Sequence, residues 1–213
     1  SPHPEDVDDD MLFVIRDHAN ICNSVHLPLQ AGADRILKRM NRTYTQAQFL
    51  SLTDRIRNIL PGCGISTDMI VGFPGETEEE FDETLAVMEK IKFDSAFTFK
   101  YSSRPGTKAA EYNDHIPEEV KEIRLAKLLD FQHEHTLFRN RQEIGKTVNV
   151  LVEKESKKSS SEWAGRTDNN KWVIFPKGSA EIFDFVDVTI IDARGVSLFG
   201  EIIQVGKKPH AVV

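Results

Sequence analysis

Three short apolar segments, separated by helical patterns, constrain the fold of this chain more than any other feature of its sequence. They cover residues 24–29, 65–71 and 95–101. Strands that alternate with helices of about 10–15 residues indicate parallel βαβ units, and we expect three such units here. A complete eightfold (β/α) barrel needs about 250 residues. The sequence therefore predicts an α/β fold that amounts to at most half of such a barrel.

Two helix starts carry the capping-box pattern, in which the N-cap residue and the residue three positions later satisfy each other's backbone N–H groups. Thr45 is followed by Gln48, and Thr77 is followed by Glu80. A third and longer helix is expected over 117–143, because it opens with a proline, which suits the first helical position. This helix would close the half-barrel.

The composition changes near Gly145. Residues 1–144 have 17 basic and 25 acidic side chains (net −8), whereas residues 145–213 have 10 and 9 (net +1). Short β-rich segments follow, and five of them within about 60 residues predict a small antiparallel β-barrel. These segments are 147–153, 162–166, 171–175, 185–192 and 197–203. We therefore divide the chain into a half-barrel (1–144), a β-barrel (145–206) and a tail (207–213).

Several classes of protein are excluded by what the chain contains. No run of 18 apolar residues exists, so we expect no transmembrane helix and no membrane partner. The two cysteines, Cys22 and Cys63, are too few for a disulfide scaffold, a CxxC metal site or an iron–sulfur cluster held by this chain alone. No signal peptide opens the chain, which indicates the reducing cytoplasm. The opening Ser1-Pro2-His3-Pro4 lacks an initiator Met and suggests a fragment of a longer protein.

Three polar side chains stand where the expected strands end or soon after. They are Gln30, Arg42 and Asp68. Active sites of (β/α) barrels lie at that edge, and the forked donors of Arg suit a carboxylate. The set could bind a polar cofactor that has a ribose and a carboxylate. An Arg–Asp structural pair beside a strand-end Gln is the alternative, and the pattern alone favours it.

A glycine-containing loop joins the second expected strand to the next helix. It reads Gly72-Phe73-Pro74-Gly75-Glu76. Glycine lets a backbone come close to a ligand, so an adenine could lie against this loop. The alternative is a tight turn that only caps the helix.

A basic segment with two tryptophans lies in the predicted β-barrel. Basic residues interleaved with aromatic ones on a small barrel are typical of a nucleic-acid surface, although a solvated hairpin is the alternative. The basic residues are Lys154, Lys157, Lys158, Arg166 and Lys171, the tryptophans are Trp163 and Trp172, and a turn with Asn169 and Asn170 lies among them.

Taken together, four ordered segments resemble the radical-SAM methylthiotransferases. Residues 26–44 resemble the fourth-strand region of that family, 68–77 its fifth-strand motif, and 101–110 the segment after its sixth strand. Gly165-Arg166-Thr167-Asp168-Asn169-Asn170 resembles its C-terminal TRAM domain, an RNA-binding β-barrel, in the form seen in the MiaB-type tRNA enzymes. The resemblance covers nearly the whole chain.

The resemblance implies a reaction and its cofactors. MiaB-type enzymes methylthiolate C2 of N6-isopentenyladenosine next to the tRNA anticodon, using S-adenosylmethionine (SAM) and two [4Fe–4S] clusters. It further implies that Gln30, Arg42 and Asp68 contact SAM and that the Gly72–Glu76 loop lies near its adenine. The TRAM-like region would bind the tRNA anticodon stem-loop. No residue of this chain is assigned as catalytic.

Some features of the family are missing from this chain. The CxxxCxxC loop and the N-terminal domain with its three cysteines are absent, and Ala31 and Ala33 stand where the family has serines. We therefore expect the chain to be inactive alone and to need the missing N-terminal portion of the same polypeptide. The alternatives are a methylthiotransferase for another modified adenosine or for a ribosomal-protein aspartate, and a non-catalytic RNA-binding protein. Intact Gln30, Arg42 and Asp68 argue against the last of these.

Overall fold

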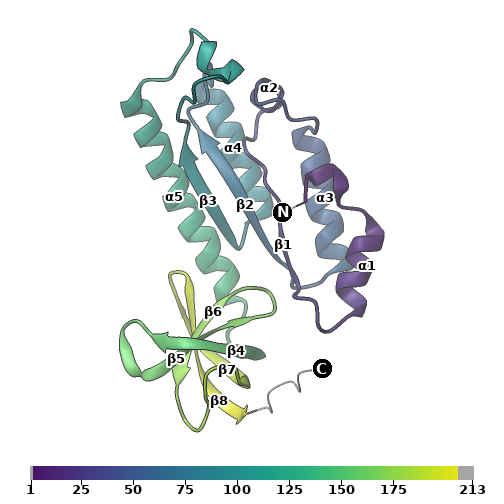
Figure 1. Cartoon of the computed structure of the whole chain (residues 1–213), viewed down its shortest axis with the longest axis vertical. Coiled ribbons are helices and arrows are strands. Elements are labelled where there is room, and N and C mark those ends of the chain that lie inside the picture. The colour runs from purple at the N-terminus through teal and green to yellow at the C-terminus, as the bar shows by residue number, and fades with distance from the viewer. Residues whose placement is uncertain (1, 206–213) are drawn as a thin grey trace.

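The computed structural model describes residues 2–205 and shows a sheet-and-helix unit followed by a small β-barrel (Figure 1). The tail predicted over 207–213 lies outside the described residues. The helical elements of the first unit are η1 (Pro4–Asp6), α1 (Asp9–Asp17), α2 (Asp34–Arg39), α3 (Gln46–Ile59), α4 (Glu78–Ile91), η2 (Lys108–Glu111) and α5 (Glu118–Arg141). Its strands are β1 (Ser24–His26), β2 (Gly64–Val71) and β3 (Ser95–Lys100).

The three strands form one parallel sheet in the order β1-β2-β3, which confirms the predicted βα units. Strand β1 is shorter than predicted and ends at His26. Pro28 has no N–H to donate to the ladder, and the Leu29 N–H donates to the Thr67 side chain (2.9 Å) in place of a backbone carbonyl. Pairing with β2 resumes only at Gln30, as an isolated bridge to Met69.

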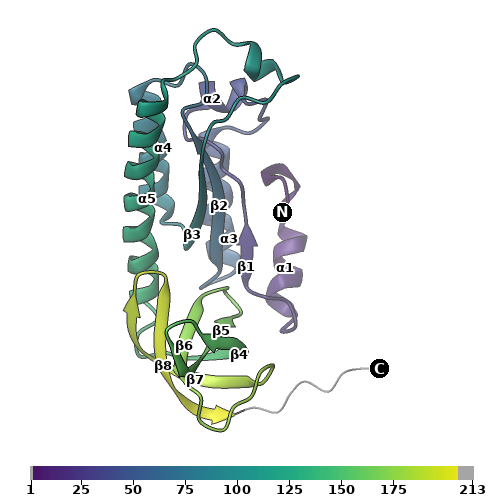
Figure 2. The same ribbon diagram turned by 60° about the vertical axis from the view of Figure 1, so that its left-hand side comes forward.

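Both predicted capping boxes are present. Helix α3 follows Thr45, which bonds reciprocally with Gln48, and α4 follows Thr77, which does the same with Glu80. Helices α3, α4 and α5 cover one face of the sheet, and Figure 2 shows α4 and α5 side by side there. None of the helices within residues 2–205 has the length and apolar character that crossing a membrane requires.

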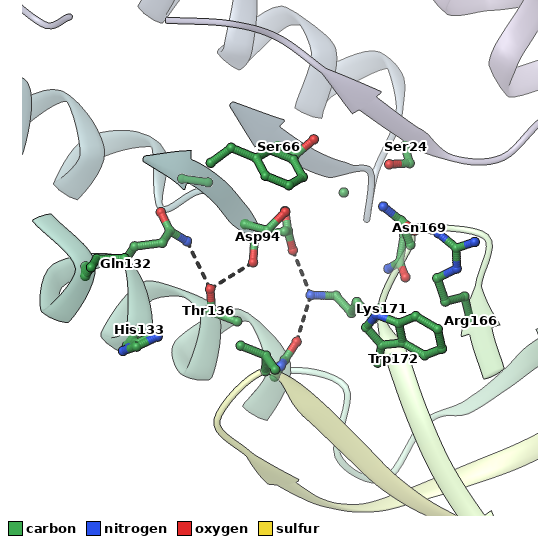
Figure 3. A pocket seen from close by; sticks show the side chains of 18 residues that line it. Ser24, Ser66, Asp94, Gln132, His133, Thr136, Arg166, Asn169, Lys171 and Trp172 are labelled. Carbon is green, nitrogen blue, oxygen red and sulfur yellow. Dashed lines mark hydrogen bonds and ion pairs between the residues drawn. The ribbon is translucent and has the colours of Figure 1, made fainter. Parts of the chain in front are cut away.

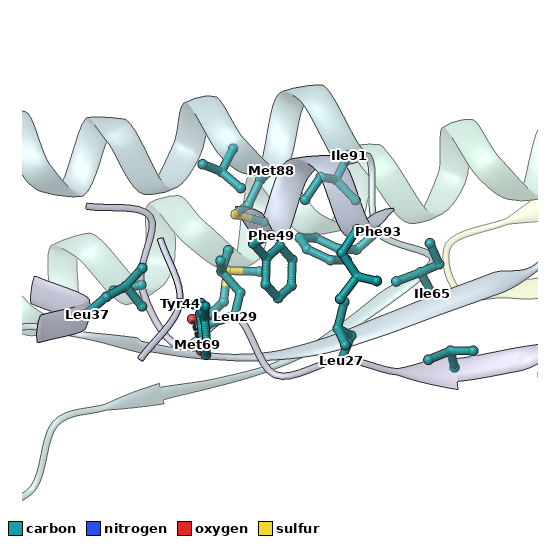
Figure 4. Close-up of a cluster of buried hydrophobic side chains, with 14 of the residues drawn as sticks. Leu27, Leu29, Leu37, Tyr44, Phe49, Ile65, Met69, Met88, Ile91 and Phe93 are labelled. Carbon is teal, nitrogen blue, oxygen red and sulfur yellow. Dashed lines mark hydrogen bonds between the residues drawn. The ribbon is translucent and has the colours of Figure 1, made fainter. Parts of the chain in front are cut away.

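The core of the first unit lies between the sheet and these helices (Figure 4). In β2, the residues at odd positions are buried in this core, while those at even positions face the other side of the sheet. The other side is much more open, because Phe97 and Phe99 of β3 are 58% and 53% exposed there. The fully buried side chains of the core include Leu27, Leu29, Phe49, Met69 and Phe93.

The second unit is a closed barrel of five strands in the order β4-β5-β6-β8-β7. Four of the pairings are antiparallel, but β6 and β8 pair in parallel. The predicted small β-barrel is confirmed, and one pairing is parallel because an odd number of strands in a closed ring cannot alternate in direction throughout. The strands are β4 (Thr147–Ser156), β5 (Ser159–Thr167), β6 (Trp172–Pro176), β7 (Phe185–Arg194) and β8 (Ser197–Val205).

A buried ion pair joins the two units. The Lys171 Nζ lies 2.7 Å from Asp94 Oδ1 and donates to Asn140 Oδ1 (3.2 Å), and Lys171 is only 7% exposed. The β5–β6 turn also touches the sheet, since Asn169 Nδ2 donates to the Gly62 carbonyl (3.3 Å). A Cβ at Gly64 would overlap the Asn169 carbonyl, so the close approach requires glycine there.

Removing the cation of this pair should destabilise the chain. Lys171→Met leaves the Asp94 carboxylate, which is 13% exposed, without its cation, and breaking such a largely buried pair costs about 3 kcal/mol. Urea unfolding should show this loss of free energy of unfolding, while Lys157→Met, in the exposed β4–β5 turn, should change it little. Equal unfolding midpoints for the two variants would contradict the role of the pair.

Candidate functional site

A pocket of about 920 Å³ opens at the carboxyl ends of the sheet strands. Small-molecule sites usually measure about 300–1,000 Å³. Three of the residues singled out from the sequence, Gln30, Arg42 and Asp68, line this pocket together with Phe73. The structure therefore brings together side chains that lie 38 positions apart in the chain, at the edge where we expected a cofactor.

Gln30 lies in this pocket with an unusual backbone. Its φ of 70° falls in the left-handed region, which a residue with a Cβ rarely adopts without a compensating contact. The compensation comes from two backbone bonds to β2, since the Gln30 N–H donates to Asp68 O (2.8 Å) and the Ile70 N–H donates to Gln30 O (2.9 Å). This left-handed backbone at Gln30 thus holds the residue next to Asp68 of β2.

Tyr44 supports the segment that leads into this bend. Its buried hydroxyl donates to the carbonyls of Pro28 (3.0 Å) and Leu29 (2.9 Å). Burial raises the pKa of the Tyr44 phenol to about 12. The phenol thus stays protonated and remains a donor over the whole physiological range.

Asp68 is oriented by a histidine on the neighbouring strand. His26 Nε2 lies 3.3 Å from Asp68 Oδ2, and His26 Nδ1 lies 2.9 Å from the Ser66 hydroxyl. The imidazole also meets the edge of the Phe97 ring at 5.9 Å between centroids. His26 is hydrogen-bonded, as expected for a histidine on an apolar strand, and it holds the carboxylate toward the pocket.

Arg42 does not form the structural pair with Asp68 that was the alternative. Asp68 pairs with His26, and the buried Arg42 Nε has no hydrogen-bond partner among the described residues. Buried donors are seldom left unpaired. A carboxylate-bearing ligand in the pocket would satisfy this guanidinium, so the residues fit a ligand such as SAM.

The Gly72–Glu76 loop is placed differently from the other candidates. Of its residues Gly72, Phe73, Pro74, Gly75 and Glu76, only Phe73 lines the pocket. The Glu76 carboxylate is 1% exposed, accepts from the Gly72 N–H (2.7 Å) and pairs with Arg124 of α5 (2.7 Å). Its side chain therefore closes the loop and anchors α5 and does not face the pocket. An adenine against the loop backbone stays a prediction.

The pocket also contains residues that the sequence reading did not select. The segment after β3 contributes several of them, and its position at the same sheet edge was the available signal. Six of the lining residues are cationic and one, Asp68, is acidic, although the chain as a whole has a net charge of −7. The cationic residues are Lys38, Arg39, Arg42, Lys100, Arg104 and Lys108.

The basic candidates on the β-barrel divide into two groups. Lys154 and Arg166 lie over the Trp172 ring, at 4.3 and 5.3 Å from its centroid, and Lys157 and Lys158 are exposed at the β4–β5 turn. Arg166 also pairs with Glu153 (2.6 Å) and donates to Asn170 (3.0 Å). These residues form an exposed cationic surface around an aromatic ring.

Asn169 and Lys171 lie elsewhere than on this exposed surface. The Lys171 ammonium is buried against Asp94, and the Asn169 amide contacts the sheet unit. The prediction that Lys171 contacts RNA does not agree with the structure, because its ammonium forms an ion pair with Asp94 of the other unit.

The thiols and the other metal-binding side chains are dispersed over the described part of the chain. Cys22 is exposed and Cys63 is buried, and burial raises the pKa of the Cys63 thiol to about 12. Within residues 2–205, no three His, Cys, Asp or Glu side chains lie together as ligands for a metal ion. These residues do not fit an iron–sulfur cluster.

Comparison with known families identifies both units. The radical SAM superfamily matches residues 1–88, and the TRAM domain matches residues 141–203. The chain therefore contains part of a radical SAM domain followed by a TRAM domain. The fold is shared with coproporphyrinogen III oxidase from Escherichia coli, a radical SAM enzyme, with a TM-score of 0.53 and 16% identity over 78% of this chain and 45% of that one.

Within this class, the chain is similar to curated proteins of one kind. It is 46% identical over 200 residues to tRNA-2-methylthio-N(6)-dimethylallyladenosine synthase from Christiangramia forsetii, covering 93% of this chain and 42% of the relative. The synthase of the same name from Parabacteroides distasonis is 47% identical over 203 residues, with 95% and 44% covered. The chain thus spans less than half the length of these relatives. The resemblance to MiaB-type methylthiotransferases is confirmed.

Loss of the Tyr44 hydroxyl should weaken the structure around Gln30. Tyr44→Phe removes a donor to two carbonyls and should cost about 1 kcal/mol of unfolding free energy near neutral pH. In the native chain, stability should also fall between pH 10 and about 12, because the unfolded phenol loses its proton first. Denaturant titrations across this range should show a smaller fall in Tyr44→Phe than in Tyr112→Phe. Parallel curves for the two variants would contradict this assignment.

Proposed function

We propose that this chain is part of a tRNA-modifying enzyme that methylthiolates C2 of N6-isopentenyladenosine next to the anticodon by radical SAM chemistry. The observation that carries the proposal is the identity of 46% to a tRNA-2-methylthio-N(6)-dimethylallyladenosine synthase over 93% of this chain, which includes both units. The two [4Fe–4S] clusters of such an enzyme would be held by residues other than those of this chain. Because its substrate is tRNA, we place the enzyme in the cytoplasm.

The pocket at the carboxyl ends of the strands is the proposed SAM site. Arg42 would bind the carboxylate of the cofactor, and Asp68, held by His26, would accept hydrogen bonds from ribose hydroxyl or amino groups. Gln30 would contact the cofactor from its bent segment. Phe73 and the backbone of the loop that it opens, Gly72 to Glu76, would lie near the adenine.

When bound and cleaved with one electron from a [4Fe–4S] cluster held outside this chain, SAM would supply hydrogen-atom abstraction, which suits the target C2–H bond because that bond is not usefully acidic. The residues of this chain bind and orient the cofactor and exclude water from it. Two of the six basic lining residues are already paired, Arg39 with Asp114 and Lys100 with Glu118 and Glu122. The other four, Lys38, Arg42, Arg104 and Lys108, have no ion pair among the described residues and support an anionic substrate such as RNA at the rim.

The TRAM unit is the proposed contact for the anticodon stem-loop. Lys154, Lys157, Lys158 and Arg166 would bind RNA phosphates, with Asn170 in the adjoining turn. The Asn169 amide contacts the sheet unit instead. The rest of the same polypeptide is the other partner that we propose.

Removing the Asp68 carboxylate should impair SAM cleavage in a protein that joins these residues to the CxxxCxxC loop. Loss of hydrogen bonds to a charged group costs about 1.5–3 kcal/mol, so Asp68→Ala should cleave SAM at least roughly tenfold more slowly at low SAM concentration. Asp82→Ala, at an exposed site on α4, serves as the control. A wild-type cleavage rate for Asp68→Ala would remove this residue from the site.

The lysines of the β4–β5 turn should contribute to RNA affinity. Lys157→Ala with Lys158→Ala should weaken binding of an anticodon stem-loop and flatten the dependence of log K on log salt, by about 0.7–0.9 per lost phosphate contact. The double variant Lys90→Ala with Lys127→Ala removes the same charge from the helical face and should change neither quantity. Equal salt slopes for both double variants would count against the surface.

A further inference from the structure

The segment between β3 and α5 reaches the rim of the proposed SAM pocket (Figures 1 and 2). It spans residues 101–117, and the short η2 is its only regular element. A connection longer than about 12–15 residues with so little secondary structure is usually functional. Its first ten residues, 101–110, carry one of the four family-like segments of the sequence. They belong neither to the proposed cofactor contacts nor to the surface of the β-barrel.

A hydrogen-bonded turn gives this segment a defined shape. The Arg104 carbonyl accepts from the Thr107 N–H (3.2 Å) and from the Thr107 hydroxyl (2.8 Å). Pro105 suits the second position of such a turn, and Gly106, with a φ of 82°, supplies the left-handed third position of a type II turn. The ends of a β-turn lie within about 7 Å of each other, so Arg104 and Lys108 belong to one compact feature. We call residues 104–108 the basic turn.

The start of the segment is fastened to the strands and to α5. The Tyr101 N–H donates to the Val71 carbonyl (2.9 Å), and the Tyr101 carbonyl accepts from Lys121 Nζ of α5 (3.3 Å). The Tyr101 ring meets the edge of the Phe73 ring at 5.1 Å between centroids. The position of the segment where it leaves β3 is therefore fixed by the wall of the pocket.

The other side of the basic turn is fastened to α2 and to the loop after β2. The Asp114 carboxylate accepts two hydrogen bonds from Arg39 Nη2 (2.8 and 2.9 Å), and its carbonyl accepts from the Gly75 N–H (2.7 Å). The Arg39 guanidinium also lies 4.3 Å from the centroid of the Tyr112 ring. Because the basic turn is held in place from both sides before a ligand arrives, less conformational entropy is lost on binding.

The charged residues of the segment are divided between two sides. Arg104 and Lys108 line the pocket, whereas the acidic residues Glu111 and Asp114 do not. Neither Arg104 nor Lys108 forms an ion pair within the described part of the chain. The basic turn thus presents two unpaired cations on a preformed support, which suits an anion.

The opposite end of the sheet has no such free cation in its pocket wall at Lys171. That ammonium is already bound by Asp94 and Asn140 (Figure 3). The contrast shows that burial and pairing have already used the Lys171 charge, while the charges of the basic turn are available.

The position of the basic turn indicates which anion it binds. SAM has a single carboxylate, for which Arg42 is proposed, and its sulfonium and amino groups are cationic, so further cations would repel it. A nucleotide whose base reaches the cofactor brings its own phosphates to the rim of the pocket. The forked donors of Arg match a phosphate, and Lys adds a point charge.

We propose that the basic turn binds the RNA phosphate beside the nucleotide to be modified, with Arg104 as the forked donor and Lys108 as a second charge. Arg104 is then a positioning residue, which holds the target base near the cofactor and takes no part in the chemistry. This inference rests on the proposed function and adds to it the place where the backbone of the target nucleotide is held.

The test uses the complete polypeptide with its clusters and an anticodon stem-loop that carries N6-isopentenyladenosine. Arg104→Ala should weaken stem-loop binding roughly tenfold, as loss of a hydrogen bond to a charged group does. It should also reduce the slope of log K against log salt by about 0.7–0.9. Arg104→Lys should restore the slope but only part of the affinity, because Lys lacks the fork. SAM cleavage without RNA should stay within about twofold in both variants, and Lys90→Ala, at an exposed site on α4, should bind like the native protein.

An RNA with an uncharged linkage locates the contact. Two stem-loops carry a methylphosphonate in place of the phosphate on the 5′ or on the 3′ side of the target nucleotide. One of them should bind the native protein roughly tenfold more weakly than the unmodified stem-loop. Arg104→Ala should bind that RNA and the unmodified stem-loop equally, because the same contact cannot be lost twice.

The shape of the turn can be tested without a change of charge. Gly106→Ala has open space for its Cβ, but a φ of 82° strains any residue with a side chain, so the turn should distort. Its stem-loop affinity should fall severalfold while SAM cleavage without RNA stays native. Gly62→Ala, with a φ of 79° and open space at the opposite end of the sheet, is the matched control and should keep the native affinity.

The outcomes separate this inference from the proposed function. If Arg104→Ala and Lys108→Ala keep the native stem-loop affinity while the Lys157 and Lys158 double variant binds more weakly, the role of the basic turn is overturned and the proposed function stands. Slower SAM cleavage, or a lower unfolding midpoint, in Arg104→Ala at native stem-loop affinity would also overturn it, since Arg104 would then serve the cofactor or an internal ion pair. If the complete polypeptide neither binds the stem-loop nor cleaves SAM, the proposed function falls as well.

Discussion

The arrangement of the two units depends on one carboxylate, that of Asp94, whose side chain is only 13% exposed. Asp94 stands just before β3, accepts from the Ile65 N–H of β2 (2.9 Å) and meets the Lys171 ammonium of the barrel at 2.7 Å. One side chain thus joins two strands of the sheet to the barrel. In a parallel sheet, such a contact at the amino edge leaves the carboxyl edge free for ligands. The position of Asp94 therefore explains why the β-barrel contacts the amino edge of the sheet, while the pocket opens at the carboxyl edge.

Local patterns were enough to predict much of the fold. The alternation of apolar and helical segments and the two capping boxes, at Thr45 and Thr77, depend on residues close in sequence, and all are present. The early end of β1 was missed because it depends on a bond from Leu29 to Thr67, 38 residues away. The parallel pair in the barrel was missed because it follows from closure of the ring, which no single segment reveals.

The sequence was enough to place the candidate site residues that stand at strand ends. It was not enough to place residues whose interaction partners lie far away in the sequence. Gln30 and Asp68 share a pocket because parallel strands end at one edge, which the sequence pattern implies. Glu76 turned out to anchor α5 through Arg124, 48 residues away, and the Lys171 ammonium pairs with Asp94, 77 residues away. From the sequence alone, the charged groups of Glu76 and Lys171 could equally have faced solvent or RNA. Only the packing of elements distant in the sequence decides which charged side chains already form ion pairs within the protein.

Helix α5 touches both ends of this arrangement. It binds the loop after β2 through Arg124, which donates to Glu76, and the junction of the two units through Asn140, which accepts from Lys171. A continuous helix of 24 residues, at about 1.5 Å per residue, is about 36 Å long and cannot stretch. It therefore fixes the distance between the pocket at the carboxyl ends of the strands and the junction with the β-barrel. The length of one helix would then set how far the β-barrel surface stands from the pocket at the carboxyl ends of the strands.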